Sequence, residues 1–427
     1  MFQILTNHKY LLPLYLWLIY SITTILVFEF GPLDFRVENK FTLYTYLFFA
    51  HFFSALGYLK SYKKYKLLND LKNKSKFLNK NNLNFISFII VLSLIIGFYR
   101  DYTSDVNLNL AIEDTLAASE AGELRGGGWL GYLNGFLNVF KLPFLTIALI
   151  NFRNLTKFQK YLLIVLVFRL IFASIVGSTR HGIFMLIIIV FFSLLALKFN
   201  NQIRISFKKL FIRIFLVVFL FLVYSSYISI NRNLRPIDNM VEYMSNNDKY
   251  ELDTNNFLIP KFTGNLELIN AGVLTGYFYF THAYKGLSEA LSLPFKGTSL
   301  FFGHSDFTIR NLARVFSDDE MLNYSYHYRL SNEVSYPKTL WITAYAWIAS
   351  DLTFIGSFFL LYFFGSLLAS SWIRSLKAPT LISCSVFGWI IYFFFQTNIT
   401  FVPADLGAFI SFWGSIFIYK FKINTSN

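Results

Sequence analysis

Arginine side chains are the first candidates for chemistry in this chain. A guanidinium group stays charged at any working pH and matches phosphate oxygens with two parallel hydrogen bonds. The candidates outside apolar stretches are Arg180, Arg232, Arg235, Arg310 and Arg314. The last two are four residues apart, so one helix face can present both. The pattern predicts a site for an anionic group. The alternative for Arg180 is a contact with a lipid phosphate, and the alternative for the other four is an ordinary solvated surface charge.

Four further charges lie inside or at the edge of apolar stretches: Lys141, Arg169, Asp351 and Asp405. A charge near the middle of a bilayer is costly and normally faces a polar cavity or a partner. Lys141 and Arg169 have no acid at comparable depth, which leaves two interpretations, snorkelling into a water-filled crevice or a cationic cavity for a phosphate head group. If one helix continues from Arg169 to Arg180, the two lie on one face about 16 Å apart.

A single histidine could act as a general base, because imidazole ionises near neutral pH. His282, His304 and His327 are too widely spaced for a helical metal motif, and the single cysteine excludes a multi-cysteine site. We therefore expect neither a metal nor a cofactor.

The elements that must position these residues are those of a membrane protein. The 427 residues are 55% apolar and only 15% charged, whereas a soluble domain is about a quarter charged. Stretches of roughly 20 apolar residues can cross the hydrocarbon core. We find them near 10–28, 41–59, 83–99, 129–150, 161–177, 182–197, 210–230, 350–372, 380–398 and 405–419. The sequence predicts an all-α polytopic membrane protein with about 10 transmembrane helices.

The loops between these stretches alternate in charge. Loop 60–82 carries eight lysines, whereas segment 100–128 has two cations against six acids. Loops rich in Lys and Arg remain in the cytoplasm. Ten spans then place every basic loop and both termini on the cytoplasmic side, which explains most of the net charge of +14. We expect no nucleic-acid binding, because no basic stripe coincides with a soluble fold.

A polar segment of 108 residues, 231–338, divides the chain into three parts. Residues 1–230 hold seven expected spans, 231–338 form a large external loop, and 339–427 hold three spans. Residues 277–292 are apolar but contain His282 and Glu289, so we expect an interfacial helix on the outer leaflet. Tyr284 suits the headgroup level, and Trp341 could belong to an interfacial aromatic belt.

Three segments, in this order, resemble those of Wzy-type O-antigen polymerases. The turn 177–180 (Gly-Ser-Thr-Arg) resembles their Gly-Ser-Arg element, and 279–288 resembles their Tyr-x-Thr-x-Gly-Tyr-Tyr-Gly-Leu segment. Residues 341–343 followed by 350–356 resemble their Trp-x-Thr and Asp-Phe-Gly entry to a late span. The chain departs from these patterns by the additional Thr179, by Ala283 and Lys285, and by Leu352-Thr353 before Phe354.

The resemblance implies a GT-C-like, metal-independent glycosyltransferase at the outer face of a bacterial cytoplasmic membrane. A hydroxyl of one undecaprenyl-pyrophosphate-linked repeat would attack the anomeric carbon of the growing chain, and undecaprenyl pyrophosphate would leave. The arginines, with Arg169, Tyr284 and Trp341, would bind substrate, and Trp341 could do so by stacking on a sugar ring. His282, Arg180, Asp351 and Glu289 would be catalytic. His282 is the first candidate for the base that takes the proton of the acceptor hydroxyl, followed by Glu289 and Asp351. Expected partners are the lipid-linked donor and acceptor, membrane lipids and a chain-length-regulating co-polymerase.

Two other functions remain open. An O-antigen ligase would share the topology and the chemistry. A non-enzymatic transporter of polysaccharide or lipid-linked sugars is less favoured, because such proteins show internal repeats and lack a large one-sided loop. The absence of a nucleotide-binding motif argues against ATP-driven transport by this chain itself.

Overall fold

The computed structural model describes most of the chain and places nearly all of it in helices. The described residues are 8–66, 80–102, 129–176, 180–203, 206–233, 251–253, 255–259, 267–298, 302–334, 336, 340–401 and 406–424. Strand β1 (Leu33–Asp34) pairs antiparallel with β2 (Glu251–Leu252). Asp405 and Arg235 lie outside the described residues.

Six segments in the described part of the chain are long and apolar enough to cross a membrane. They belong to α2 (Leu12–Phe30), α4 (Lys80–Tyr102), the pair α7 (Trp129–Asn138) and α8 (Lys141–Ile150), α9 (Lys157–Val176), α10 (His181–Phe199) and α16 (Ala344–Lys377). The short 3-10 helix η2 (Phe152–Asn154) connects α8 to α9. These helices confirm the class of helical membrane protein.

The other expected spans are also helical. The stretches at 41–59 and 210–230 lie in α3 (Lys40–Lys66) and α11 (Phe207–Asn233). Those at 380–398 and 405–419 correspond to α17 (Leu381–Gln396) and α18 (Leu406–Asn424), which are shorter apolar helices. The number of ten membrane crossings stays a prediction.

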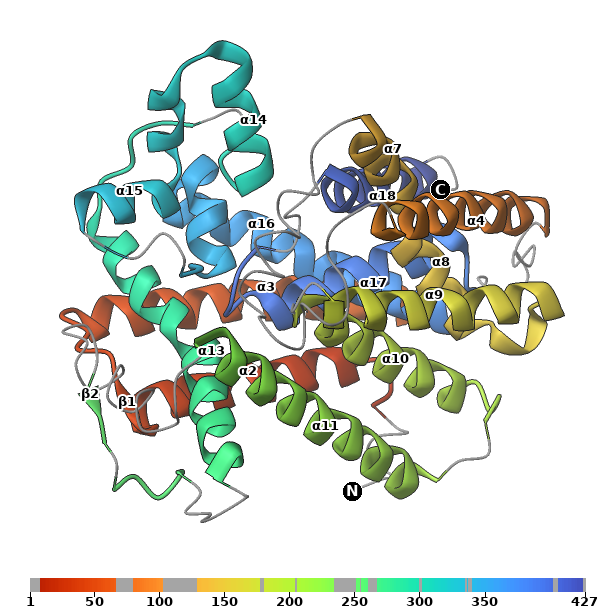
Figure 1. Ribbon diagram of the computed structural model, residues 1–427, viewed down its shortest axis with the longest axis horizontal. Coiled ribbons are helices and arrows are strands. Elements are labelled where there is room, and N and C mark those ends of the chain that lie inside the picture. Colours follow the sequence, from red (N-terminus) through yellow and green to blue (C-terminus); the bar gives the residue numbers. More distant parts are fainter. Residues whose placement is uncertain are drawn as a thin grey trace.

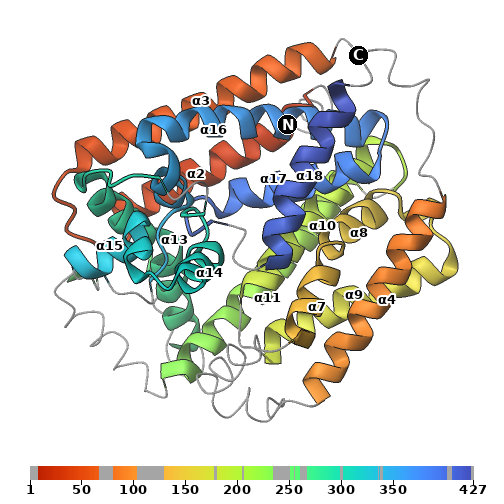
Figure 2. The same ribbon diagram turned by 90° about the horizontal axis from the view of Figure 1, so that it is seen from above.

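Helices α3 and α16 run parallel and side by side (Figures 1 and 2). At one end the Tyr46 hydroxyl lies 2.7 Å from the Ser357 hydroxyl, and at the other Lys377 donates to the carbonyl of Tyr65 at 3.3 Å. The lysine-rich end of α3 and the basic end of α16 therefore lie together. The N-terminal turn joins them, because the Trp372 indole donates to the Lys9 carbonyl at 2.9 Å.

Helix α16 is broken near its start. Thr353 has φ 66° and ψ 165°, a conformation that a β-branched residue rarely adopts. Its hydroxyl accepts from the Gly356 amide at 3.1 Å, as a cap for the helical segment that follows. Asp351 lies just before this break.

The large polar segment forms its helices at one end of the bundle (Figure 1). They are α13 (Glu267–Ser292), α14 (Asp306–Phe316), the 3-10 helix η4 (Asp319–Tyr324) and α15 (Tyr326–Glu333). Arg329, almost fully buried, holds α15 in place through hydrogen bonds to the Pro294 carbonyl and the Glu333 carboxylate. Arg329 and Lys296 lower the pKa of Glu333 to about 2.

Helix α13 is longer than the helix expected at 277–292, and it is more enclosed. It packs against α2, α3, α11 and α16. Four consecutive residues, 281–284, are buried, so the helix has no wide solvent-facing side of the kind that an interfacial helix presents. Its position relative to a membrane stays a prediction, but its packing is that of a helix within the bundle.

Candidate functional site

The turn around Arg180 joins two helices and does not continue one. Helix α9 ends at Val176, and α10 begins at His181 with Arg180 at its N-cap position. Arg180 Nη2 donates to the Ser225 carbonyl in α11 at 3.1 Å. The guanidinium carbon lies 5.4 Å from the ring centroid of Tyr279 in α13. The structure thus brings Arg180, the last residue of the segment 177–180, against the first residue of the segment 279–288.

A cavity opens beside this contact, where α10, α11, α13 and α17 meet. It is lined by Arg180, His181, Phe184, Phe221, Leu222, Ser225, Gly276, Tyr279, Phe280, Gln396 and Ile399. The space accessible to water is about 20 Å³, enough for a single water molecule. Polar groups concentrate on the α10 and α17 side, and aromatic rings cover the α11 and α13 side.

His181, which the sequence reasoning did not select, is hydrogen-bonded within this cavity. The Tyr392 hydroxyl lies 2.7 Å from its Nδ1 and 3.0 Å from its Nε2. Gln396 donates to the same hydroxyl at 3.2 Å. Two signals could have identified this group: His181 directly follows Arg180, and Tyr392 and Gln396 are polar residues on one face of an apolar helix.

Arg169 lies apart from Arg180. Its guanidinium carbon is 5.3 Å from the ring centroid of Phe98, and its side chain packs beside Gly97 in α4. The expected cationic track from Arg169 to Arg180 required one continuous helix. Because α9 stops at Val176, the structure does not form that track.

His282, the first candidate for a base, is buried in α13 and does not line the cavity. Its Nδ1 donates to the Phe278 carbonyl at 2.8 Å, and its ring stacks on that of Phe278 at 4.8 Å. Nε2 is buried without a hydrogen-bond partner. Burial lowers the pKa of His282 to about 4. The imidazole is therefore neutral at physiological pH, and its role as a base stays a prediction.

Two other candidates on α13 make internal contacts. Tyr284 is fully buried, and its hydroxyl lies 3.0 Å from the Thr24 hydroxyl of α2, so it packs two helices together and is closed to substrate. Glu289 pairs with Lys285 at 3.2 Å, one turn away on the same helix. Lys285 also donates to the Arg36 carbonyl. These polar groups explain why α13 can be enclosed despite its charges.

Asp351 is separate from Arg180 and holds the segment before α14. Its carboxylate accepts from the amides of Gly303 and His304, and from His304 Nδ1 at 2.9 Å. The Trp413 indole donates to His304 Nε2 at 3.1 Å. Both ring nitrogens of His304 are therefore engaged in hydrogen bonds. Asp351 and His304 have the geometry of a structural clamp.

The remaining candidates do not line the cavity. Arg310 pairs with Asp306, and Arg314 is exposed on the same helix, α14. Trp341 is partly exposed, and its ring stacks near His327 at 6.2 Å. Arg232 lies in the last turn of α11, but its side chain is outside the described residues.

Comparison of the chain with protein-family models, curated proteins and solved structures finds no match. Among the described residues, no three His, Cys, Asp or Glu side chains come close enough to hold a metal ion. The function must therefore be inferred from the Arg180 cavity itself.

Proposed function

We propose that this protein polymerises undecaprenyl-pyrophosphate-linked oligosaccharide repeat units into a surface polysaccharide. The reaction would take place at the outer face of a bacterial cytoplasmic membrane. The acceptor hydroxyl attacks the anomeric carbon, the bond from that carbon to the pyrophosphate oxygen breaks, and undecaprenyl pyrophosphate departs as an anion. The hydroxyl proton passes to a base.

The observation that carries this proposal is the contact between Arg180 and Tyr279. It joins the turn at 180 to the segment 279–288, which lie far apart in the sequence and resemble the same family. A fixed guanidinium beside an enclosed cavity is suited to stabilise the charge that develops on a leaving pyrophosphate. Arg180 is the residue to which we assign this role.

His181 is better placed than His282 to accept the proton. Its imidazole lines the cavity beside Arg180, and Tyr392 orients it. The cavity accommodates about one water molecule, so a pyrophosphate group requires Arg180 and Tyr279 to separate. On substrate binding, phosphate oxygens would replace the ring of Tyr279 beside the guanidinium of Arg180.

The packing of α3 and α16 supports the proposed orientation. In an arrangement of ten spans, the second and the eighth run in the same direction, as these two parallel helices do. The basic loops then lie in the cytoplasm with both termini, and α13 to α15 lie outside. On this arrangement the Arg180 turn is on the outer side with them.

The test is reconstitution of the full chain in liposomes with a purified lipid-linked repeat. A ladder of polymer lengths from the native protein, and none from Arg180→Ala, is the expected result. Arg153→Ala, which removes an exposed arginine of η2, is the matched control and should extend chains normally. Transfer of finished chains to another lipid would instead identify a ligase, and movement of intact lipid-linked sugar without transfer would identify a transporter.

A further inference from the structure

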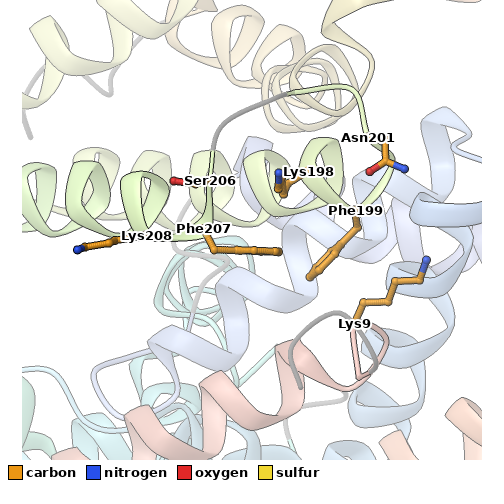
Figure 3. A pocket seen from close by; sticks show the side chains of 7 residues that line it. All are labelled: Lys9, Lys198, Phe199, Asn201, Ser206, Phe207 and Lys208. Atoms are coloured by element: carbon orange, nitrogen blue, oxygen red, sulfur yellow. The ribbon is translucent and has the colours of Figure 1, made fainter. Parts of the chain in front are cut away.

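A second cavity lies among basic side chains, between the turn that joins α10 to α11 and the N-terminal turn. Its volume is about 580 Å³. It is lined by Lys9, Lys198, Phe199, Asn201, Ser206, Phe207 and Lys208 (Figure 3). The three lysines come from three different elements, the N-terminal turn and the ends of α10 and α11 that meet there.

Local structure fixes the walls of this cavity. Asn201, at φ 55°, ends α10 in the left-handed conformation, and its amide donates to the Lys198 carbonyl. The Lys198 ammonium lies 5.6 Å from the ring centroid of Phe207, at the start of α11. On the opposite side, the hydrogen bond from the buried Trp372 to the Lys9 carbonyl fixes the N-terminal turn.

Among the described residues that line the cavity, no acid balances the lysines. None of the seven lining residues is acidic, and the sequence has no Asp or Glu from 124 to 237, a range that includes all of α10 and α11. Lys198 lies in the last turn of α10, where a cation is favourable in any case. That effect does not explain why Lys9 and Lys208 border the same space. An anionic ligand does.

An apolar surface continues from this cavity along α11. Ile212, Phe215, Leu216 and Leu220 are each more than half exposed. Phe199 and Phe207 face one another inside the cavity (Figure 3), so apolar surface begins at the basic residues themselves. A ligand with an anionic head and a hydrocarbon tail matches both parts.

We propose that this cavity binds the phosphate headgroup of an anionic membrane lipid, whose acyl chains lie along the exposed face of α11. Lys9 and Lys198 offer their ammonium groups to the phosphate, Lys208 lies at the edge of the cavity, and Asn201 and Ser206 offer hydrogen-bond donors. Basic pockets between helices on the cytoplasmic side bind such lipids by the same chemistry. This site is independent of the Arg180 cavity and of the proposed glycosyl transfer.

The test compares phosphatidylglycerol with phosphatidylcholine in nanodiscs that contain the full chain. Native mass spectrometry after release from the disc counts the lipids that stay bound. The native protein should retain phosphatidylglycerol. Lys9→Gln with Lys198→Gln should weaken its apparent affinity about 25-fold, or about fivefold for each lysine. Lys63→Gln with Lys209→Gln removes the same charge from exposed positions outside the cavity. This control should change the apparent affinity for phosphatidylglycerol by less than about twofold.

Three outcomes would overturn the proposal. An equal loss of phosphatidylglycerol retention in the control variant would mean that the lipid is attracted generally to basic loops. Unchanged retention in the cavity variant would show that the cavity does not bind the lipid. Competition by millimolar inorganic phosphate, without retention of phosphatidylglycerol, would identify a soluble phosphate ligand. Lys208→Gln, at the edge of the cavity, serves if the double variant fails to fold, and we expect about fivefold weaker retention from it.

Discussion

The guanidinium of Arg180 lies over the ring of Tyr279, with its central carbon 5.4 Å from the ring centroid. The same group donates to the Ser225 carbonyl, so one side chain connects α10, α11 and α13. An aromatic face holds a cation in position without neutralising it. Arg180 is thereby oriented by contacts with α11 and α13.

This relationship gives the first prediction. Arg180→Lys and Arg180→Ala should each lower the rate of chain extension by about 100-fold or more. The alanine variant has no cation at the leaving group, and the lysine variant lacks the planar geometry of the guanidinium. Tyr279→Phe keeps the aromatic face, so its rate of chain extension should stay within about threefold of native. For Tyr279→Leu we expect a rate about tenfold lower than native. Rates of ladder formation in liposomes measure this. Equal rates for the Phe and Leu variants would remove the orienting role of the ring.

A second prediction concerns the imidazole in the cavity. His181→Gln should lower the turnover rate by about 100-fold, in the range for loss of a general base, with KM for the lipid-linked acceptor little changed. Tyr392→Phe removes the hydroxyl that orients His181 and should lower the turnover rate about tenfold. Single-turnover kinetics with saturating substrate separates turnover from binding. An effect confined to KM would make His181 a binding group only.

His282 gives a prediction about pH. Burial lowers its pKa to about 4, below the ordinary 6.5, so the unfolded chain binds more protons than the folded protein between these values. The stability associated with neutral His282 is fully present above about pH 6.5 and is lost as the pH falls toward 4, on the order of 3 kcal/mol in total.

His282→Leu should therefore flatten the fall in melting temperature between pH 7 and pH 4.5, measured by thermal unfolding in detergent. Chain extension at pH 7.5 should survive in this variant if the residue only packs. Loss of extension with an unaltered melting profile would return the role of base to His282.

Sequence patterns predicted the helices well, because hydropathy depends on local composition. The stretch expected at 182–197 is contained in α10, and the one at 83–99 in α4. The sequence left open whether one helix continues from Arg169 to Arg180, and the structure separates the two residues.

Side-chain pairing across the fold could not be predicted in the same way. His304 and Asp351 are 47 positions apart, and nothing local indicates that they meet. The charges on α13 suggested an exposed face, but Lys285 is satisfied by Glu289 and by a carbonyl of a distant segment. Partners of this kind depend on the tertiary structure. The periodicity of a single sequence does not reveal them.

The clamp formed by Asp351 and His304 yields a fourth prediction. Asp351→Asn keeps the shape but weakens the acceptor for three donors, and His304→Gln removes one of them. Each should destabilise the fold by on the order of 2 kcal/mol. Because both substitutions break the same contact, the double variant should lose much less unfolding free energy than the sum of the two single losses. Thermal unfolding of all four proteins measures the coupling, and strictly additive losses would contradict it.

The same variants distinguish the clamp from a catalytic role for Asp351. A clamp predicts that limited proteolysis between α13 and α14 accelerates in Asp351→Asn and in His304→Gln alike. A catalytic carboxylate predicts that Asp351→Asn alone abolishes chain extension, with proteolysis unchanged.

The last prediction concerns the closest approach between α3 and α16. A Cβ atom at Gly57 would overlap the Tyr362 carbonyl oxygen, and one at Gly365 would overlap the Ser54 carbonyl oxygen. Small residues let helix backbones approach closely where lipid offers no hydrophobic driving force. Gly57→Ala and Gly365→Ala should each destabilise the protein by about 2 kcal/mol or more, because backbone atoms cannot move aside as side chains do.

Gly414→Ala is the matched control, since an added methyl there meets no atom within 4 Å. It lies in helix α18, so replacing glycine should leave stability unchanged or raise it slightly. Thermal unfolding in one detergent compares the three variants. If all three melt alike, then α3 and α16 are not packed through these glycines, and the parallel pair that supports the proposed orientation loses its basis.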